Sequence, residues 1–301
     1  MSITVTPVHP EFVAEIGGVD VARPLSPPDR QAIEDAINRF AVVVFRGQTL
    51  DDEKQVAFAR NFGPVASSAL RLRHRDIKHR IDSDEVADIS NLDGDGNVLK
   101  PDARRRLDGL ANRLWHTDAS FRAVPGALSM LYAHVVPEEG GDTEFADMRA
   151  AYDALDEARK ALVETLHARH SLHYSQSKLG HETKKADGEY SGYGLHDGPV
   201  PLRPLVKTHP ETGRKSLLIG RHAYAIPGLE PAESERFLQD LIDFACQPPR
   251  IYHHDWSPGD AVLWDNRCLL HQATPWDMTQ KRIMWHSRIA GDPASETALA
   301  R

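Results

Sequence analysis

Apolar and polar positions follow several patterns along the chain, and each pattern predicts a type of element. Residues 2–7 alternate apolar and polar side chains, which is typical of a strand with one covered face. The run 42–45 is apolar throughout and predicts a buried strand. Apolar residues at helical spacing predict a helix over 230–246. Further short strands are predicted at about 127–135, 205–206, 216–220, 260–264 and 282–289.

Two other helices are indicated by residues that favour helix ends. Ser26 precedes two prolines and Asp29, a combination that favours a helix N-terminus, and this helix should run to about Arg39. A second helix is predicted from Thr49 to Asn61, before a glycine that can end it.

The order of these elements predicts a mostly β protein with flanking helices. Many short strands joined by long loops favour an antiparallel double-stranded β-helix, or jelly-roll, core with helices packed outside it. The strand–helix alternation of a parallel sheet is missing, and so are the glycine-rich nucleotide-binding motifs. We expect residues 1–301 to form a single domain, with loop or lid insertions at about 66–113 and 167–200.

Composition narrows the classes of function. The chain has 301 residues, of which 41% are hydrophobic and 27% charged, as in an ordinary globular protein. Its formal net charge is −8, and the absence of a long basic cluster argues against a nucleic-acid partner. No apolar run approaches the roughly 18 residues that a membrane span requires, and the N-terminus lacks a signal-peptide pattern. We therefore expect a cytoplasmic protein with neither a membrane nor a nucleic-acid partner.

The stretch 114–121 contains the first candidate chemistry, because His116 and Asp118 stand two positions apart. If this stretch is a strand, the imidazole and the carboxylate project from the same face. A second histidine would complete the set of two histidines and one carboxylate that binds Fe(II) and leaves positions open for reactants. The chain has 16 histidines and 44 acidic residues, so such a pair arises easily by chance and the hypothesis depends on a third ligand.

A candidate third ligand, His271, ends a strand-like run, and Arg282 follows at the start of another predicted strand. In that strand Arg282, His286 and Arg288 share one face. A planar guanidinium can grip a carboxylate with two parallel hydrogen bonds, as a site for a small dicarboxylic acid requires. From the residues alone, a zinc hydrolase with the same three ligands or a non-catalytic jelly-roll binding protein stays open, although zinc needs no such arginine.

Taken in this order, the motifs resemble those of the Fe(II)/2-oxoglutarate-dependent dioxygenases of the taurine dioxygenase and 2,4-dichlorophenoxyacetate dioxygenase type. The resemblance covers nearly the whole chain and rests on His116-Thr117-Asp118, Gly140-Gly141-Asp142-Thr143, Trp264-Asp265-Asn266-Arg267 before His271, and Arg282. It implies that His116, Asp118 and His271 bind the iron, and that Thr143 and Arg282 hold the distal carboxylate of 2-oxoglutarate. It also implies O2 as the second co-substrate.

One branch of this family resembles the chain more closely, the aryloxyalkanoate dioxygenases that act on (S)-2-phenoxypropionates. The similar stretches are 145–155, 170–172, 174–181, 217–223 and 284–288. This resemblance implies hydroxylation of a phenoxyacetate or phenoxypropionate at the carbon next to its carboxylate, as in herbicide degradation. The product falls apart to a phenol and an oxo acid, and 2-oxoglutarate becomes succinate and CO2. The alternative is the same chemistry on an alkylsulfonate such as taurine or on another small carboxylate.

The chain departs from the taurine-type pattern at the residue that grips the anionic group of the substrate. That pattern has an arginine four residues after the 2-oxoglutarate arginine, and here the position is occupied by His286. Arg288, the next residue on the same predicted face, is our first candidate for the role, and Asn112, four positions before His116, is the second. The family resemblance also implies a homo-oligomer that binds a small anionic substrate.

Overall fold

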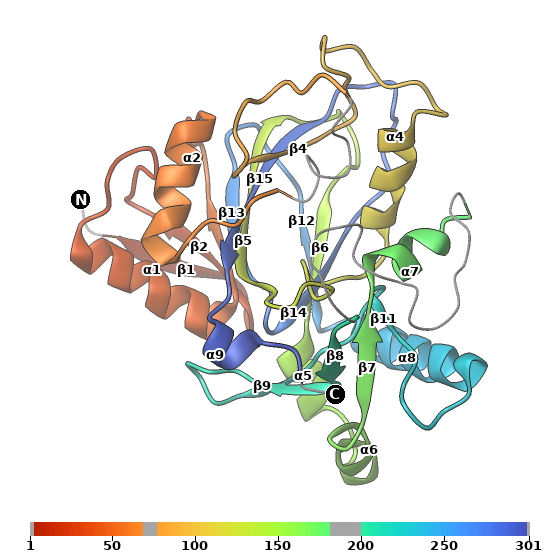
Figure 1. The fold of residues 1–301 in the computed structure, drawn as a ribbon. Helices are drawn as coiled ribbons and strands as arrows, with labels where there is room; N and C mark the ends of the chain where they lie inside the picture. The colour runs from red at the N-terminus through yellow and green to blue at the C-terminus, as the bar shows by residue number, and fades with distance from the viewer. Residues whose placement is uncertain (1–2, 69–76, 181–199, 300–301) are drawn as a thin grey trace.

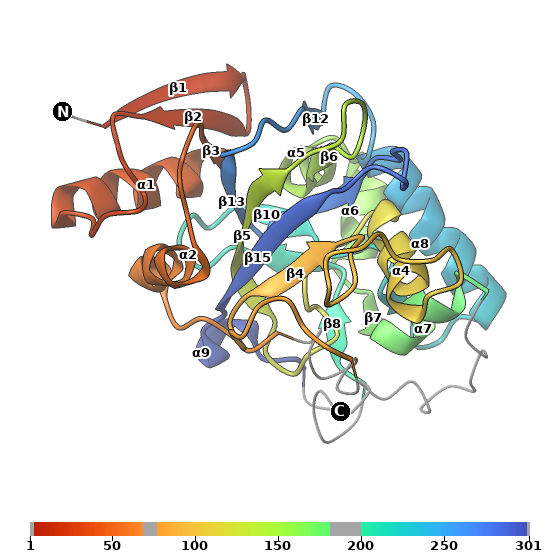
Figure 2. The same cartoon turned by 90° about the horizontal axis from the view of Figure 1, so that it is seen from above.

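Two facing sheets with helices outside them form the centre of the molecule (Figure 1). The computed structural model describes residues 3–68, 77–180 and 200–299. Helices near the N-terminus cover one side of this sheet pair, and helices from the middle of the chain cover the other (Figure 2). The predicted jelly-roll core with flanking helices is confirmed.

The larger sheet in the described residues has seven strands in the order β1-β2-β3-β13-β5-β15-β4. Neighbouring strands are antiparallel, except that β2 and β3 are parallel. The strands are β1 (Thr4–His9), β2 (Val13–Gly17), β3 (Val42–Phe45), β13 (Ala261–Asp265), β5 (Gly126–Val135), β15 (Ile283–Ala290) and β4 (Ala87–Ser90). The facing sheet consists of β12 (Ile251–His254), β6 (Thr143–Asp147) and β14 (Leu269–Ala273), all antiparallel.

Alternation along each strand decides which side chains enter the layer between the sheets. On β3, Val42 and Val44 face the smaller sheet, whereas Val43 and Phe45 face the N-terminal helices. Phe145 of the smaller sheet packs in the same inner layer. Both faces of β3 are therefore buried, which explains why the run 42–45 is apolar throughout.

Two helices cover the outer face of the larger sheet. They are α1 (Pro27–Phe40) and α2 (Asp52–Ala59), and their apolar residues pack on the outward side chains of the sheet. The predicted start of α1 is confirmed, because the Ser26 hydroxyl accepts a hydrogen bond from the Asp29 amide at 3.2 Å. The second helix is shorter than predicted, since Asp51 caps it and the chain tightens into η1 (Arg60–Phe62).

The outer face of the smaller sheet is covered by α5 (Met148–Asp153) and α8 (Pro231–Ala245). Ala146 and Leu270 of the sheet belong to the same buried cluster as Leu238 of α8. The predicted helix over 230–246 is thus confirmed within one residue at each end. Peripheral elements are α6 (Glu157–Val163), β8 (Leu202–Pro204), β9 (Val206–Thr208), β10 (Lys215–Leu217), β11 (Ala223–Tyr224) and α9 (Pro293–Glu296).

The two stretches predicted as loop insertions contain regular structure. Beside β4, the first contains α4 (Arg104–Gly109), which continues into η2 (Leu110–Arg113). The second contains β7 (His167–His170) and α7 (Leu172–Ser177), and its residues 181–199 lie outside the described ones. These elements are too short for periodicity to distinguish them from loops. Both α4 and α7 lie on the same side of the sheet pair (Figure 1).

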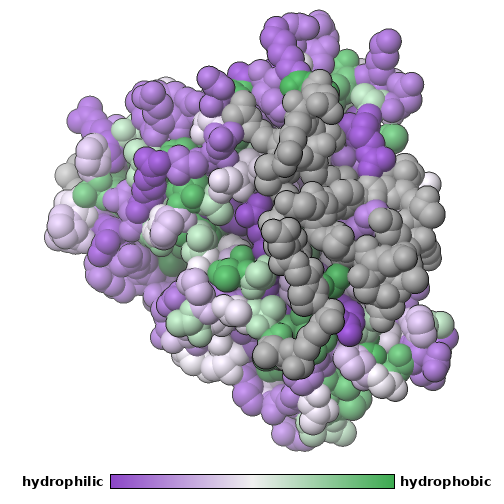
Figure 3. All heavy atoms as spheres, viewed as in Figure 1, coloured by the Kyte–Doolittle hydropathy of each residue, from purple (hydrophilic) through white to green (hydrophobic). Residues whose placement is uncertain are grey.

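Apolar side chains are scattered over much of the face shown in Figure 3. Hydrophilic residues dominate the upper and left parts of the face in Figure 3, and apolar residues show there as small patches. In the part of the chain that the structure describes, no helix has both the length and the apolar character to cross a bilayer.

Candidate active site

A short antiparallel bridge brings His116 next to His271. The His116 amide donates to the His271 carbonyl at 3.0 Å, and the His271 amide donates back at 2.8 Å. On β14, His271 pairs in register with Phe145 and shares its inward orientation. The two imidazole rings therefore lie 4.2 Å apart between their centroids.

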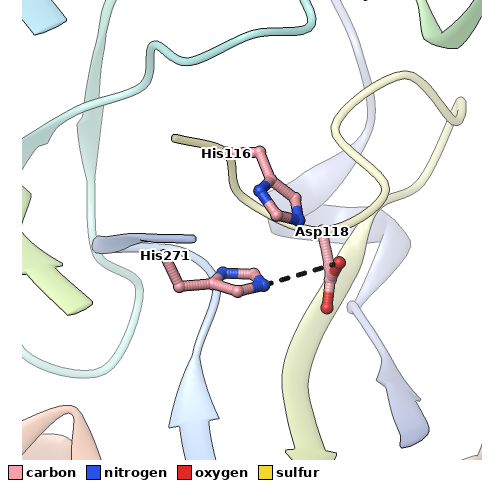
Figure 4. Close-up of side chains that lie close together, drawn as sticks. All are labelled: His116, Asp118 and His271. Atoms are coloured by element: carbon pink, nitrogen blue, oxygen red, sulfur yellow. Dashed lines mark ion pairs between the residues drawn. The ribbon is translucent and has the colours of Figure 1, made fainter. Parts of the chain in front are cut away.

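Asp118 reaches the site through a turn and not through a strand. Residues 118–121 form a turn in which Ala119 adopts a left-handed φ of 58°, so the conditional expectation of a strand over 114–121 is wrong. The side chains of His116 and Asp118 converge nevertheless, because the chain turns directly after the bridge. The potential ligand atoms of His116, Asp118 and His271 all lie within 4.8 Å of one another. Figure 4 shows the three side chains pointing toward one another.

Burial and hydrogen bonds set the charge state of these three side chains. Burial lowers the pKa of His116 well below its usual value and that of His271 to about 4, so both imidazoles are neutral at pH 7. Nδ1 of His116 pairs with the Leu114 carbonyl at 2.7 Å, which leaves Nε2 as the free nitrogen. Burial alone would raise the pKa of Asp118, but the contact with His286 and the charge of Arg288 outweigh it and hold this pKa well below its usual value.

Two neutral imidazoles and one carboxylate on the wall of a cavity are a suitable donor set for a divalent metal. The cavity has a volume of about 220 Å³ and directly adjoins all three side chains. The arrangement fits Fe(II) with open coordination positions better than structural zinc, which is usually enclosed by four protein ligands.

The cavity also contains the predicted co-substrate pair, Thr143 and Arg282. Nε of Arg282 donates to the Gly141 carbonyl at 2.8 Å, and its guanidinium lies 5.2 Å from the Trp276 ring centroid. Burial lowers the pKa of Arg282 to about 10, so it stays charged at neutral pH. The hydroxyl of Thr143 accepts from the indole of Trp256 at 3.0 Å and so keeps its own hydrogen for a ligand.

A search against known proteins gives a consistent result. The profile of the "Taurine catabolism dioxygenase TauD, TfdA family" matches residues 4–288. The chain is 63% identical over 300 residues to the (S)-phenoxypropionate/alpha-ketoglutarate-dioxygenase of Sphingobium herbicidovorans, covering 98% of both proteins.

This chain belongs to the TauD/TfdA family.

Other members of the TauD/TfdA family extend the similarity. The alpha-ketoglutarate-dependent 2,4-dichlorophenoxyacetate dioxygenase of a Burkholderia species is 43% identical, with 97% of this chain and 95% of the relative covered. The crystal structure of AAD-2 in complex with Mn(II) and N-oxalylglycine superposes with a TM-score of 0.91 at 39% identity, over 99% of this chain and 100% of that one.

The three predicted substrate contacts of this TauD/TfdA member all line the cavity, in different surroundings. Asn112 lies on η2. His286 and Arg288 share a face of β15, as predicted, but Nε2 of His286 pairs with Asp118 Oδ2 at 3.0 Å. Arg288 has buried Nε and Nη1 atoms without a hydrogen-bond partner in the described residues. Of the three, Arg288 therefore has the greatest unsatisfied capacity for an anion.

Arg221 and His222 are among the cavity residues that the sequence prediction did not assign to the site. They follow Gly220, whose backbone passes close to the segment that contains His116. A Cβ at this glycine would lie 3.2 Å from the His116 Cα. The Arg221 amide donates to the Trp115 carbonyl at 2.8 Å, which anchors this segment beside the first ligand. A buried apolar run that ends in glycine, arginine and histidine was the sequence pattern that could have indicated them.

A second cluster with metal-ligand chemistry, formed by His209, Asp265 and Cys268, is an ion-pair network. The Arg267 guanidinium donates to both Asp265 oxygens, at 2.9 and 2.6 Å, and His209 Nε2 adds a contact of 2.9 Å. Burial raises the pKa of the Cys268 thiol well above its usual range. A cation there would have to displace a guanidinium that already neutralises the carboxylate.

Proposed function

We propose that this protein is an Fe(II)- and 2-oxoglutarate-dependent dioxygenase that acts on aryloxyalkanoates of the phenoxyacetate or phenoxypropionate type. The reaction hydroxylates the carbon next to the substrate carboxylate. It yields a phenol and an oxo acid, together with succinate and CO2 from 2-oxoglutarate. The main support is the cavity itself, where a His-Asp-His donor set lies beside two arginine side chains, the buried Arg282 and the half-buried Arg288.

We assign the metal and the co-substrate to separate residues. His116, Asp118 and His271 would hold the iron, and Thr143 with Arg282 would hold the distal carboxylate of 2-oxoglutarate. When bound, Fe(II) with 2-oxoglutarate and O2 supplies the oxidising power that amino-acid side chains lack. The protein contributes the positions of the reacting groups.

Arg288 would bind the carboxylate of the substrate, with Asn112 as a second contact and His286 nearby. Two anions share this cavity, so two cationic side chains are needed to compensate their charge. Apolar residues elsewhere in the wall supply a surface for an aromatic ring. Its apolar residues include Ile89, Leu110, Phe121, Leu131, Leu172 and Met278. This lining favours an aryloxyalkanoate over taurine, which has no apolar ring to bury.

The decisive experiment measures succinate and phenol release with Fe(II), ascorbate and 2-oxoglutarate. The panel contains 2,4-dichlorophenoxyacetate, both enantiomers of a 2-phenoxypropionate, and taurine. We expect phenol in step with succinate from at least one aryloxyalkanoate, and none from the His116→Ala variant. Turnover of taurine alone would overturn the substrate class. A lack of any visible charge-transfer band when 2-oxoglutarate is added to the anaerobic Fe(II) protein would overturn the enzyme class in favour of a zinc hydrolase or binding protein.

A cytoplasmic location, a role in herbicide degradation and assembly into a homo-oligomer stay predictions. Sedimentation of the purified protein would test the last of these.

A further inference from the structure

One carboxylate oxygen of Asp118 is fully engaged by the protein, and the other is not. Oδ2 accepts from the Ser129 hydroxyl at 2.6 Å and pairs with Nε2 of His286 at 3.0 Å. Oδ1 is the oxygen closer to the second histidine, with His271 Nε2 at 4.0 Å (Figure 4). This asymmetry leaves a single Asp118 oxygen available on the side of the two histidines.

A directional chain of hydrogen bonds leads to the engaged oxygen. The Trp264 indole can only donate, and its Nε1 lies 3.0 Å from Asn266 Oδ1. That contact fixes the orientation of the amide, so Asn266 Nδ2 donates to the Ser129 oxygen at 2.9 Å. Ser129 must then point its own hydrogen at Asp118. The direction of each hydrogen bond follows from Trp264, the one residue in this series that can only donate.

These hydrogen bonds lie at the inner face of the larger sheet. Ser129 of β5 pairs in register with Trp264 of β13 on one side and with Arg288 of β15 on the other. Ser129, Asn266 and Trp264 are 0%, 4% and 1% exposed. Neither Ser129 nor Asn266 lines the main cavity, so any effect they have on a ligand there acts through Asp118.

Asn266 also connects this series of hydrogen bonds to the segment that contains Thr117 and Asp118. Its carbonyl accepts from the Thr117 hydroxyl at 2.6 Å, and its Oδ1 lies 3.4 Å from the Asp118 amide nitrogen. One residue therefore orients both the backbone that carries the carboxylate and the serine that restrains it.

We propose that Ser129, oriented by Asn266, is a positioning residue that holds Asp118 as a one-oxygen ligand and thereby sets the metal affinity of the site. The inference rests on the proposed metal site of His116, Asp118 and His271. Partners of this kind fix the orientation of a ligand, and their loss typically weakens metal binding about 10- to 100-fold.

The test titrates Mn(II) into the metal-free protein and follows the free ion by electron paramagnetic resonance. We expect Ser129→Ala to weaken Mn(II) binding by at least about tenfold. Ser129→Thr keeps the hydroxyl and should restore the affinity. Ser216→Ala is the matched control, because Ser216 is equally buried but donates to the Arg267 carbonyl and reaches no proposed ligand.

Two further measurements separate positioning from folding. The thermal midpoint of the metal-free Ser129→Ala protein should fall no further than that of Ser216→Ala, and kcat should fall more than the KM for the aryloxyalkanoate rises. If Ser129→Ala fails to fold, Ser129→Cys, a weaker donor of similar shape, should bind Mn(II) less tightly than wild type.

Wild-type affinity in the folded serine variant would overturn the positioning role while the metal site stands. Unchanged Mn(II) binding in His116→Ala would instead overturn the proposed site itself.

Discussion

Arg288 lies against Gly126 at the start of β5, and the missing side chain of this glycine decides where the guanidinium sits. A Cβ at position 126 would approach the Arg288 Cγ and Cδ to 2.5 Å, which no packed structure tolerates. The stem of an arginine is flexible, so it would move and carry the charged group with it.

We therefore expect Gly126→Ala to raise the KM for the aryloxyalkanoate by about tenfold, near the lower limit for losing a hydrogen bond to a charged group. The KM for 2-oxoglutarate should stay as in wild type. Steady-state kinetics with each substrate varied in turn measure both constants.

A double-mutant cycle supplies the control. In an Arg288→Ala background, the added methyl group has no stem to displace, so Gly126→Ala should then have little effect. An equal effect in both backgrounds would contradict the explanation.

At this scale the sequence indicated the residues whose chemistry is distinctive and not those whose role depends on a partner. His116, Asp118, His271, Thr143 and Arg282 were predicted from the order of their motifs, and the structure gathers them around one cavity. Ser129 was not, because nothing marks a serine within an apolar strand until Asp118 is seen beside it.

At the scale of elements, the turn before β6 positions Arg282, the arginine proposed to bind 2-oxoglutarate. Gly141 has a φ of +72°, and a Cβ there would lie 3.0 Å from both Arg282 Nε and Pro137 Cγ. The same residue accepts the hydrogen bond from Arg282 through its carbonyl.

Gly141→Ala should raise the KM for 2-oxoglutarate several-fold, and it should also destabilise the protein by about 1 kcal/mol through its left-handed backbone. Gly213→Ala is a matched control, since Gly213 has a φ of +69° but open space around its Cβ position. It should show the loss of stability without the change in KM. An equal KM for both variants would refute the contact with Arg282 as the cause.

Elements were predicted well where one local pattern decides them and poorly where a distant partner does. Ser26 and the apolar run 42–45 mark their helix and strand without help from the rest of the chain. The segment around His116 could not be read in this way, because its bridge depends on backbone groups of His271 far along the sequence. A His-x-Asp pair looks the same in a strand as in a bridge followed by a turn.

At the scale of the whole molecule, several buried histidines make the metal-free protein sensitive to acid. His170 is fully buried, and burial lowers its pKa from 6.5 to about 3. Between these two values the unfolded chain binds a proton that the folded chain does not. The free energy of unfolding therefore falls as the pH drops below about 6.5, by up to about 1.4 kcal/mol per pH unit for each such group.

His170→Leu should make this decline shallower by about that amount between pH 6 and pH 5. Neither ring nitrogen of His170 has a hydrogen-bond partner in the described residues, so the substitution removes a titrating group and no bond. Urea unfolding at a series of pH values measures the slope. Wild type and variant should run parallel above pH 8, and parallel curves below pH 6 would disprove the assignment.

The arrangement of sheets with helices outside them could be predicted in outline from the sequence. Many short strands and a few amphipathic helices can bury their apolar faces in only a few arrangements. The elements inside the two insertions were not predicted. The short helices α4 and α7 line the cavity. A local pattern of so few residues does not distinguish such helices from loops.

The cavity wall consists of two parts, which are supplied by different elements of the chain. The residues proposed to hold iron and 2-oxoglutarate lie on β6 and β14 or directly beside β15 and the His116–His271 bridge, whereas α4, η2 and α7 of the insertions supply much of the remaining surface. A change in the insertions would therefore alter the surface that faces the substrate and leave the proposed metal site in place. The choice of acid and the oxidising chemistry are thus carried by different segments of the chain.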